Sequence, residues 1–277
     1  MDLQGKKVLY VNLNKHTSET KTLPDLNQYI GGVGVGLKLL ESAKQYDPII
    51  FSIGPLNGFF PYASKTAIVI NSEAVEDLYI GGTLSTRIRF SGLDAIVLLG
   101  KSETTTVLDI NNEQVTFRDD FANYGLPGKR GVMKTTTNNL VLDDYFIAPG
   151  TLLIDKMRDK NIEGLVMTGT RTFDIKQKEK YEHLYYQILE RKDELSIKQG
   201  LFPSCSGCPM GCEKSKYGDL GGNILTHSLV TCKFAERIYS NINTAFSCLN
   251  VLGYHYTHED LENLPNLIQK MLRGFYD

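Results

Sequence analysis

The chain has 277 residues, of which 42% are hydrophobic and 22% are charged, and its formal net charge is −2. This length is enough for a substantial core in one large or two modest domains. The small net charge and the scattered Lys and Arg residues argue against a nucleic-acid partner or an anionic membrane surface. No apolar run reaches the roughly 18–20 residues that a membrane span requires, and residues 1–7 lack the apolar core of a signal peptide, so we expect a cytoplasmic protein.

Short strand-like runs dominate the first 170 residues. Residues 7–13 and 19–23 flank a polar turn and predict a hairpin. Residues 105–117 alternate on both sides of Asn111-Asn112, which predicts a second hairpin with a two-residue turn. Further strand-like runs lie at 49–53, 66–70, 83–90, 92–100 and 161–169. So many short strands with few helices between them favour an α+β sheet domain over a doubly wound α/β fold.

Glycines at 31, 32, 34 and 36 precede an apolar run that ends at Leu40. A glycine-rich loop before a helix can bind phosphate, because the N-terminus of a helix favours anions. The spacing is not G-x-G-x-x-G, and no clear strand leads directly into it, so the pattern does not favour a dinucleotide site. The alternative is that these glycines let the start of a helix pack tightly against a sheet.

The hydrophobic period changes to that of helices after residue 176. Residues 176–198 place apolar side chains at i, i+3, i+4 and i+7, which predicts an amphipathic helix. Thr257 to Asp260 form a capping-box pattern before a last apolar helix. We therefore expect an α+β fold with a β-rich domain of mixed or antiparallel sheets over 1–172, followed by a short, mainly helical region over 173–277.

Three of the five cysteines, Cys205, Cys208 and Cys212, stand at C-x2-C-x3-C spacing. Prolines and glycines between them keep the loop out of a regular helix, so three thiols can meet at one metal centre. A [4Fe–4S] cluster takes four thiolates, usually most of them from one short run. Structural zinc also takes four ligands, but usually as two separated pairs. The spacing favours an iron–sulfur site and leaves zinc, or a loop without metal, as alternatives.

The spacing alone does not identify a fourth ligand, which would come from Cys232, Cys248, a histidine or a partner chain. His227, His255 and His258 fit surface or capping positions better than ligand positions. Lys65, Arg87 and Arg89 could contact phosphate groups of a pterin or nucleotide, although the two arginines also fit the solvated face of a strand. No nucleophile motif occurs, so the sequence names no catalytic residue.

Several stretches, in this order, resemble the tungsten-dependent aldehyde:ferredoxin oxidoreductases. They are Gly31–Leu40, Gly54-Pro-Leu-Asn-Gly58, Gly81-Gly82, Phe90–Lys101 and Cys205–Cys212. In that family a β-rich N-terminal domain supports two pyranopterins that chelate tungsten or molybdenum, and a helical region binds one [4Fe–4S] cluster. The resemblance implies oxidation of an aldehyde to a carboxylate. It implies that electrons leave through a [4Fe–4S] cluster bound by Cys205, Cys208 and Cys212. It also implies cofactor contacts at Gly81, Gly82, Lys65 and Arg87.

The chain also departs from that family's pattern. Only Lys65 supplies charge where the family has an arginine, and Asn250–His255 lacks both carboxylates of the family's Asp-x-x-Gly-Leu-Asp pterin motif. Members of the family continue through further helical regions, so we expect a second chain to complete this one. Ferredoxin, as the electron acceptor, or an oligomer is the other expected partner. Two main hypotheses result: a truncated oxidoreductase, or a non-catalytic paralogue that acts as a binding, assembly or electron-transfer subunit. A zinc-stapled structural module is a third.

Overall fold

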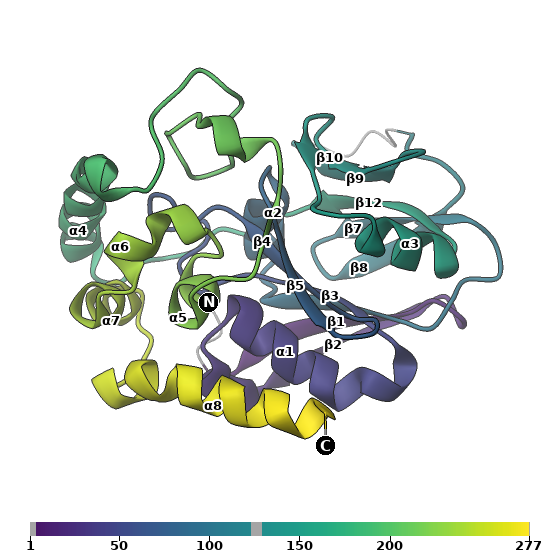
Figure 1. The fold of residues 1–277 in the computed structure, drawn as a ribbon, viewed down its shortest axis with the longest axis horizontal. Helices are drawn as coiled ribbons and strands as arrows, with labels where there is room; N and C mark the ends of the chain where they lie inside the picture. The colour runs from purple at the N-terminus through teal and green to yellow at the C-terminus, as the bar shows by residue number, and fades with distance from the viewer. Residues whose placement is uncertain (1–3, 123–128, 277) are drawn as a thin grey trace.

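The computed structural model describes residues 4–122 and 129–276. Two mixed β-sheets form the N-terminal part, and most of the helices belong to the C-terminal part (Figure 1). The predicted α+β class is confirmed. The boundary near residue 172 stays a prediction, although the last long strand ends at Thr168 and the next helix begins at Lys178.

The first sheet has seven strands in the order β13-β5-β4-β3-β6-β1-β2. Its strands are β1 (Lys6–Asn12), β2 (Thr17–Leu23), β3 (Ile49–Ser52), β4 (Thr66–Asn71), β5 (Val75–Ile80), β6 (Ala95–Leu99) and β13 (Asp219–Leu220). The predicted first hairpin is confirmed, because β1 and β2 pair antiparallel from Lys6↔Leu23 to Asn12↔Thr17. The edge strand β13 comes from the C-terminal part and pairs Asp219 with Tyr79.

The second sheet has six strands in the order β11-β10-β9-β12-β7-β8. Its strands are β7 (Thr106–Asn111), β8 (Gln114–Arg118), β9 (Gly131–Thr135), β10 (Leu140–Leu142), β11 (Phe146–Ile147) and β12 (Ile162–Thr168). The second predicted hairpin is confirmed with its turn one residue later, since Asn111 pairs with Gln114. Asn112 has a φ of 54° there, a conformation that asparagine tolerates better than most residues.

The central strands β3, β4 and β6 of the first sheet are buried on both faces, which explains their nearly continuous apolar sequence. Successive strand residues point to opposite faces. Val8 therefore contributes to the core under the helices, whereas Leu9 contributes to a second core shared with residues such as Leu165 of the other sheet.

Helix α1 (Gly32–Ala43) packs on the first sheet with its glycines at the contact. A Cβ atom at Gly36 would lie 2.6 Å from Cγ2 of Val69 and 2.9 Å from Oγ of Ser52. Any larger residue would push the helix off β4. The packing interpretation of the glycine cluster is therefore correct at this position.

The remaining helices are α2 (Leu84–Phe90), α3 (Leu152–Asp159), α4 (Lys178–Glu190), α5 (Ile224–Leu229), α6 (Glu236–Tyr239), α7 (Ile242–Val251) and α8 (His258–Tyr276). Short 3-10 turns lie at Pro24–Tyr29, Lys44–Tyr46, Arg191–Glu194, Glu213–Ser215 and Lys233–Ala235. The capping box is confirmed, since the Thr257 hydroxyl accepts from the Asp260 N–H and the Asp260 carboxylate accepts from the Thr257 N–H. No helix in the described ranges is long and apolar enough to cross a membrane.

Helix α2 corrects one expectation, because residues 83–90 were predicted to be a strand. Leu84 and Ile88, four residues apart, are both fully buried on one side of the helix. The period of two suggested by Arg87 and Arg89 is therefore misleading. Arg89 is only 2% exposed, so the interpretation of both arginines as a solvated face is wrong for Arg89.

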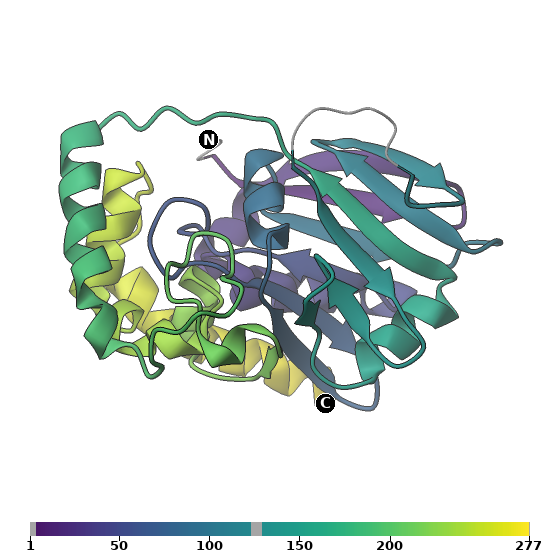
Figure 2. The same cartoon turned by 90° about the horizontal axis from the view of Figure 1, so that it is seen from above.

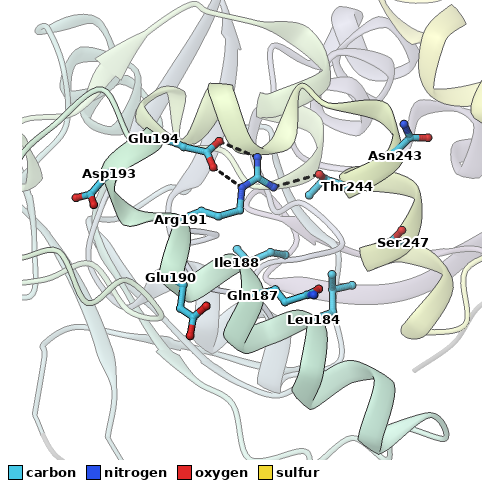
Figure 3. Close-up of a pocket in the computed structure, with 10 residues that line it drawn as sticks. All are labelled: Leu184, Gln187, Ile188, Glu190, Arg191, Asp193, Glu194, Asn243, Thr244 and Ser247. Carbon is cyan, nitrogen blue, oxygen red and sulfur yellow. Dashed lines mark hydrogen bonds and ion pairs between the residues drawn. The ribbon is translucent and has the colours of Figure 1, made fainter.

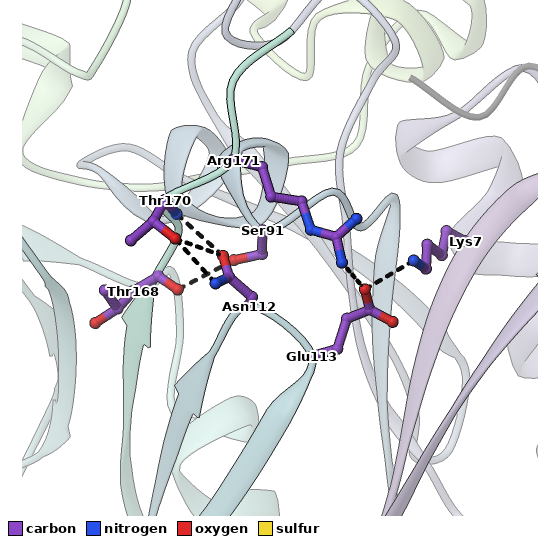
Figure 4. Close-up of polar contacts among 7 residues, drawn as sticks. All are labelled: Lys7, Ser91, Asn112, Glu113, Thr168, Thr170 and Arg171. Atoms are coloured by element: carbon purple, nitrogen blue, oxygen red, sulfur yellow. Dashed lines mark hydrogen bonds and ion pairs between the residues drawn. The ribbon is translucent and has the colours of Figure 1, made fainter.

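An extended segment after β12 crosses to α4 at the far end of the molecule (Figure 2). Its start is fixed to both sheets by polar contacts (Figure 4). The Glu113 carboxylate accepts a hydrogen bond from Lys7 of β1 at 2.8 Å and another from Arg171. The Asn112 side chain bonds both the N–H and the hydroxyl of Thr170. The turn between β7 and β8 thus holds the path that leads into the helical part.

Candidate metal centre

The cysteine loop folds back on itself between α4 and α5. The N–H of Gly200 donates to the Met210 carbonyl at 2.9 Å, and the N–H of Phe202 donates to the Gly211 carbonyl at 3.0 Å. The Ser204 hydroxyl accepts from the Gly211 N–H at 2.9 Å. These bonds replace those of a helix, so the loop is compact without being regular, as the prolines and glycines predict.

Backbone N–H groups point at the sulfurs of three cysteines. Cys205 accepts from Gly82, Cys208 from Met210 and Cys232 from Phe234. Such bonds stabilise a thiolate and are one of the means by which proteins tune iron–sulfur clusters. Cys232 therefore has a backbone N–H donor near its sulfur, as Cys205 and Cys208 do, although it lies outside the cysteine loop.

Burial opposes the charged form of these thiols. It raises the pKa of Cys205 and Cys208, and it raises the pKa of Cys232 to about 11. The buried ammonium of Lys65 partly offsets this effect at Cys205 and Cys232. These three thiols are protonated at neutral pH in the metal-free chain, so a metal centre must displace their protons when it binds.

Gly81 and Gly82 contact the cysteine loop, and their predicted contact with a cofactor stays a prediction. A Cβ atom at Gly81 would lie 2.5 Å from Sγ of Cys205. The Gly82 carbonyl accepts from the N–H of Ser206 at 3.0 Å, and the Thr86 hydroxyl bonds the Ser206 hydroxyl at 2.8 Å. The absence of a side chain at Gly81 is what allows the end of β5 to touch the loop.

Lys65 lies in the same centre and is 2% exposed. Its ammonium forms an ion pair with Asp219 of β13, whose other oxygen lies 3.0 Å from the Lys233 ammonium. Burial alone would lower the pKa of Lys65, but the charges of Cys232, Asp219 and Cys205 outweigh it and the pKa is raised. Lys65 is therefore a buried cation that faces thiols.

The other two basic candidates lie elsewhere. Arg87 packs beside Gly131 of β9, at the contact between α2 and the second sheet. Arg89 donates to the Gly54 carbonyl at 2.9 Å and to the Asn57 carbonyl at 3.2 Å, and it pairs with Asp94. Arg89 thus holds the Gly54–Gly58 turn, whereas a cofactor role for Arg87 stays a prediction.

His227 is a site residue that the sequence did not reveal. The expectation of a surface or capping position is wrong, because the side chain is fully buried and its ring stacks on Tyr79 with centroids 3.7 Å apart. Neither ring nitrogen has a well-formed hydrogen bond, although the Gly221 backbone lies close by. Burial, and then the charge of Lys65, lower the pKa of His227 to about 4. The ring is therefore neutral near pH 7.

Across the described residues, no three His, Cys, Asp or Glu side chains lie within reach of one metal ion. A [4Fe–4S] cluster binds each thiolate to a different iron, so its sulfurs stand farther apart than those around zinc. Besides burial, a thiolate at Cys232, Cys205 or Cys212 raises the pKa of Cys208, which is consistent with four sulfurs in one neighbourhood.

A separate pocket of about 600 Å³ opens between α4 and α7 (Figure 3). Arg191 forms its centre, with Nε 2.7 Å from Glu194 and Nη1 3.2 Å from the Thr244 hydroxyl. Its lining residues are Leu184, Gln187, Ile188, Glu190, Arg191, Asp193, Glu194, Asn243, Thr244 and Ser247. That lining includes no cysteine, so the pocket is distinct from the candidate metal centre.

A β-rich base joined to a cysteine loop is the arrangement of one class of metalloprotein oxidoreductases. Residues 8–142 match the family described as aldehyde ferredoxin oxidoreductase, N-terminal domain. Residues 8–142 thus carry the N-terminal domain of that family, and the resemblance seen in the sequence is confirmed to this extent.

Two curated relatives support the assignment over part of their length. The chain is 28% identical over 142 residues to the "aliphatic sulfonate oxidoreductase, WOR-like subunit" of Pyrococcus furiosus, which covers 46% of this chain and 21% of the relative. It is 29% identical over 127 residues to the "tungsten-containing aldehyde ferredoxin oxidoreductase" of Pyrococcus horikoshii, covering 41% and 21%. The matched segment thus spans about a fifth of each relative.

A solved structure matches nearly the whole chain. It is the active-site complex BamBC of benzoyl coenzyme A reductase with 1,5-dienoyl-CoA, with a TM-score of 0.61 and 16% sequence identity. The match covers 96% of this chain and 60% of that chain. At this identity the likeness shows the fold, and it extends the shared fold beyond residue 142 to the helical part.

Proposed function

We propose that the chain binds one iron–sulfur cluster through Cys205, Cys208 and Cys212 and serves as an electron-transfer subunit. The observation that carries the proposal is the gathering of buried thiols beside one buried ammonium, that of Lys65, with backbone N–H groups directed at the sulfurs. A buried group of thiols with positive charge and N–H donors suits anionic thiolate ligands better than it suits an inert core.

The predicted tungsten–pterin contacts do not fit this chain. Lys65 already pairs with Asp219, and Gly81 is already in contact with Cys205. The pterin motif of the family also lacks both carboxylates at Asn250–His255, so the charged acceptors for the donors of a pterin ring are missing. We therefore assign no pterin chemistry to this chain, and we favour a non-catalytic paralogue over a self-contained aldehyde oxidoreductase.

A [4Fe–4S] cluster bound here supplies one-electron exchange. The chain's own groups set its conditions: the Lys65 ammonium and the N–H donors stabilise negative charge and so favour the reduced state. Cys208 is only half-buried, whereas Cys205 and Cys212 are buried, so electrons have their shortest path to the surface near Cys208. Leu201 and Phe202, both exposed, lie on the same loop.

The exposed apolar pair offers a contact for a second protein. Leu201 is fully exposed and Phe202 half-exposed, and contiguous exposed apolar surface beside a site commonly marks a protein interface. The relatives are named as a subunit and as part of a complex, which supports a partner subunit or a ferredoxin-like electron carrier for this chain.

Metal analysis of anaerobically purified and reconstituted protein tests the proposal. We expect iron and sulfide in equal amounts and a broad absorption band near ~400 nm that dithionite bleaches, all lost in Cys205→Ala. Iron that is absent even after reconstitution would refute cluster binding. Tungsten or molybdenum with pterin would instead support the aldehyde oxidoreductase, and stoichiometric zinc would support the structural module.

A further inference from the structure

We propose that Cys232 supplies the fourth thiolate, so that the ligand set Cys205, Cys208, Cys212 and Cys232 is complete within this chain. The inference rests on the proposed cluster and adds a residue that lies 20 positions beyond the cysteine motif. It makes a ligand from a partner chain unnecessary.

The backbone before Cys232 is held in an unusual turn. Thr231 has a φ of 57°, which for a β-branched residue costs on the order of 1–3 kcal/mol. Its hydroxyl donates to the Lys65 carbonyl, and Asn57 donates to the same carbonyl at 3.0 Å. A strained turn fixed by buried bonds gives Cys232 a defined direction, and such strain often accompanies a functional site.

One short segment holds both cysteine-bearing parts of the chain. The N–H of Tyr62 donates to the Gly207 carbonyl within the cysteine loop at 3.3 Å, and three residues later the Lys65 carbonyl accepts from Thr231. The Lys65 ammonium lies 5.2 Å from the ring centroid of Phe234, whose N–H points at the Cys232 sulfur. Residues 62–65 therefore fix the position of Cys232 relative to Cys205 and Cys208.

Electrostatics support the same grouping. Besides burial, a thiolate at Cys232 raises the pKa of Cys208 and a thiolate at Cys205 raises that of Cys232, whereas the Lys65 ammonium lowers the pKa of both Cys205 and Cys232.

The fifth cysteine provides the contrast. Cys248 lies on α7. Burial raises the pKa of its thiol, the Arg191 guanidinium of the separate pocket partly offsets this effect, and the nearby backbone N–H is that of Cys248 itself. It is fully buried in the helical core, where a free cysteine behaves as a small apolar side chain. Cys248 is therefore the matched control for Cys232.

The test compares wild type, Cys232→Ala, Cys232→Ser and Cys248→Ala after anaerobic reconstitution with iron and sulfide. Iron and sulfide content, and the electron paramagnetic resonance spectrum before and after reduction, are the readouts. We expect about four irons per chain in wild type and Cys248→Ala. Cys232→Ala should fall to three or fewer, with the spectrum of a three-iron cluster after mild oxidation, and Cys232→Ser should keep a four-iron cluster of shifted potential.

The outcomes separate the two proposals. A wild-type chain without iron would refute the cluster itself. A wild-type chain with four irons, together with an unchanged cluster in Cys232→Ala, would refute Cys232 alone and indicate a ligand from water, a histidine or a partner. Far-ultraviolet circular dichroism and thermal melts of the metal-free variants establish that each is folded. If Cys232→Ala is unfolded, the potential of Cys232→Ser decides, and a value equal to that of wild type would refute the ligand.

Discussion

Because His227 is buried and neutral, we expect the free energy of unfolding to depend on pH through this one side chain. Its folded pKa is about 4, whereas an exposed histidine has a pKa of 6.5. The folded state therefore excludes a proton that the unfolded state binds between these values. Stability is complete above pH 6.5, falls as the pH drops toward 4, and becomes level below it.

The magnitude follows from the two pKa values. Each unit of difference corresponds to about 1.4 kcal/mol, so the full loss is about 3 kcal/mol, of which about 2 kcal/mol has occurred at pH 5. This is a large part of the ~5–15 kcal/mol that separates folded from unfolded domains.

Urea unfolding of metal-free protein at several pH values between 8 and 4 measures the effect. Carboxylates also titrate in this range, so the informative quantity is the difference between wild type and His227→Phe, which keeps a flat ring against Tyr79. That difference should change by about 3 kcal/mol across the range. A parallel pH dependence in both proteins would show that His227 is accessible to protons in the folded state and would refute the reasoning.

Three further substitutions test features of the fold. Arg89→Met should lower the free energy of unfolding by about 3–5 kcal/mol, because it removes the guanidinium partner of buried Asp94 and the donor to the buried Gly54 and Asn57 carbonyls. Arg87→Met is the control and should cost much less in the same thermal melts. Glu113→Gln should cost about 1 kcal/mol in urea at pH 7. Burial alone would raise the pKa of Glu113, but Lys7 and Arg171 outweigh it and lower that pKa, so the cost should shrink as the pH falls through the lowered pKa. A cost that does not change on acidification would contradict the ion pairs. Thr257→Ala should cost about 1 kcal/mol by removing the cap of α8, and an unchanged melting temperature would show that the cap contributes nothing.

The strands were predictable because their signals are local. Buried runs such as residues 49–53 and the two hairpins show their period within a few residues, and the structure has them close to where the pattern places them. Helix α2 was not predictable, since seven residues carry less than two full turns of pattern and two arginines imitated a strand. The helix α3 likewise gave no recognisable signal between two strands.

Part of the candidate site was also predictable from local sequence, and part was not. The cysteine motif is visible because its three thiols lie within eight residues. The environment of Lys65, the burial of His227 and the approach of residues 231–234 depend on contacts across more than 150 residues of sequence. Such contacts leave no periodic trace, so the sequence could name Cys232 only as one of several alternatives.

The two-residue strand β13 has a consequence for the order in which the protein folds. It supplies the outer strand beside β5 and, through Asp219, the counterion of Lys65. During synthesis the first sheet therefore keeps an unpaired edge, and Lys65 keeps an unpaired charge, until residue 219 has left the ribosome. The residues around Cys232 emerge later still. Insertion of iron would accordingly be among the last steps of maturation, when most of the sheet is already in place.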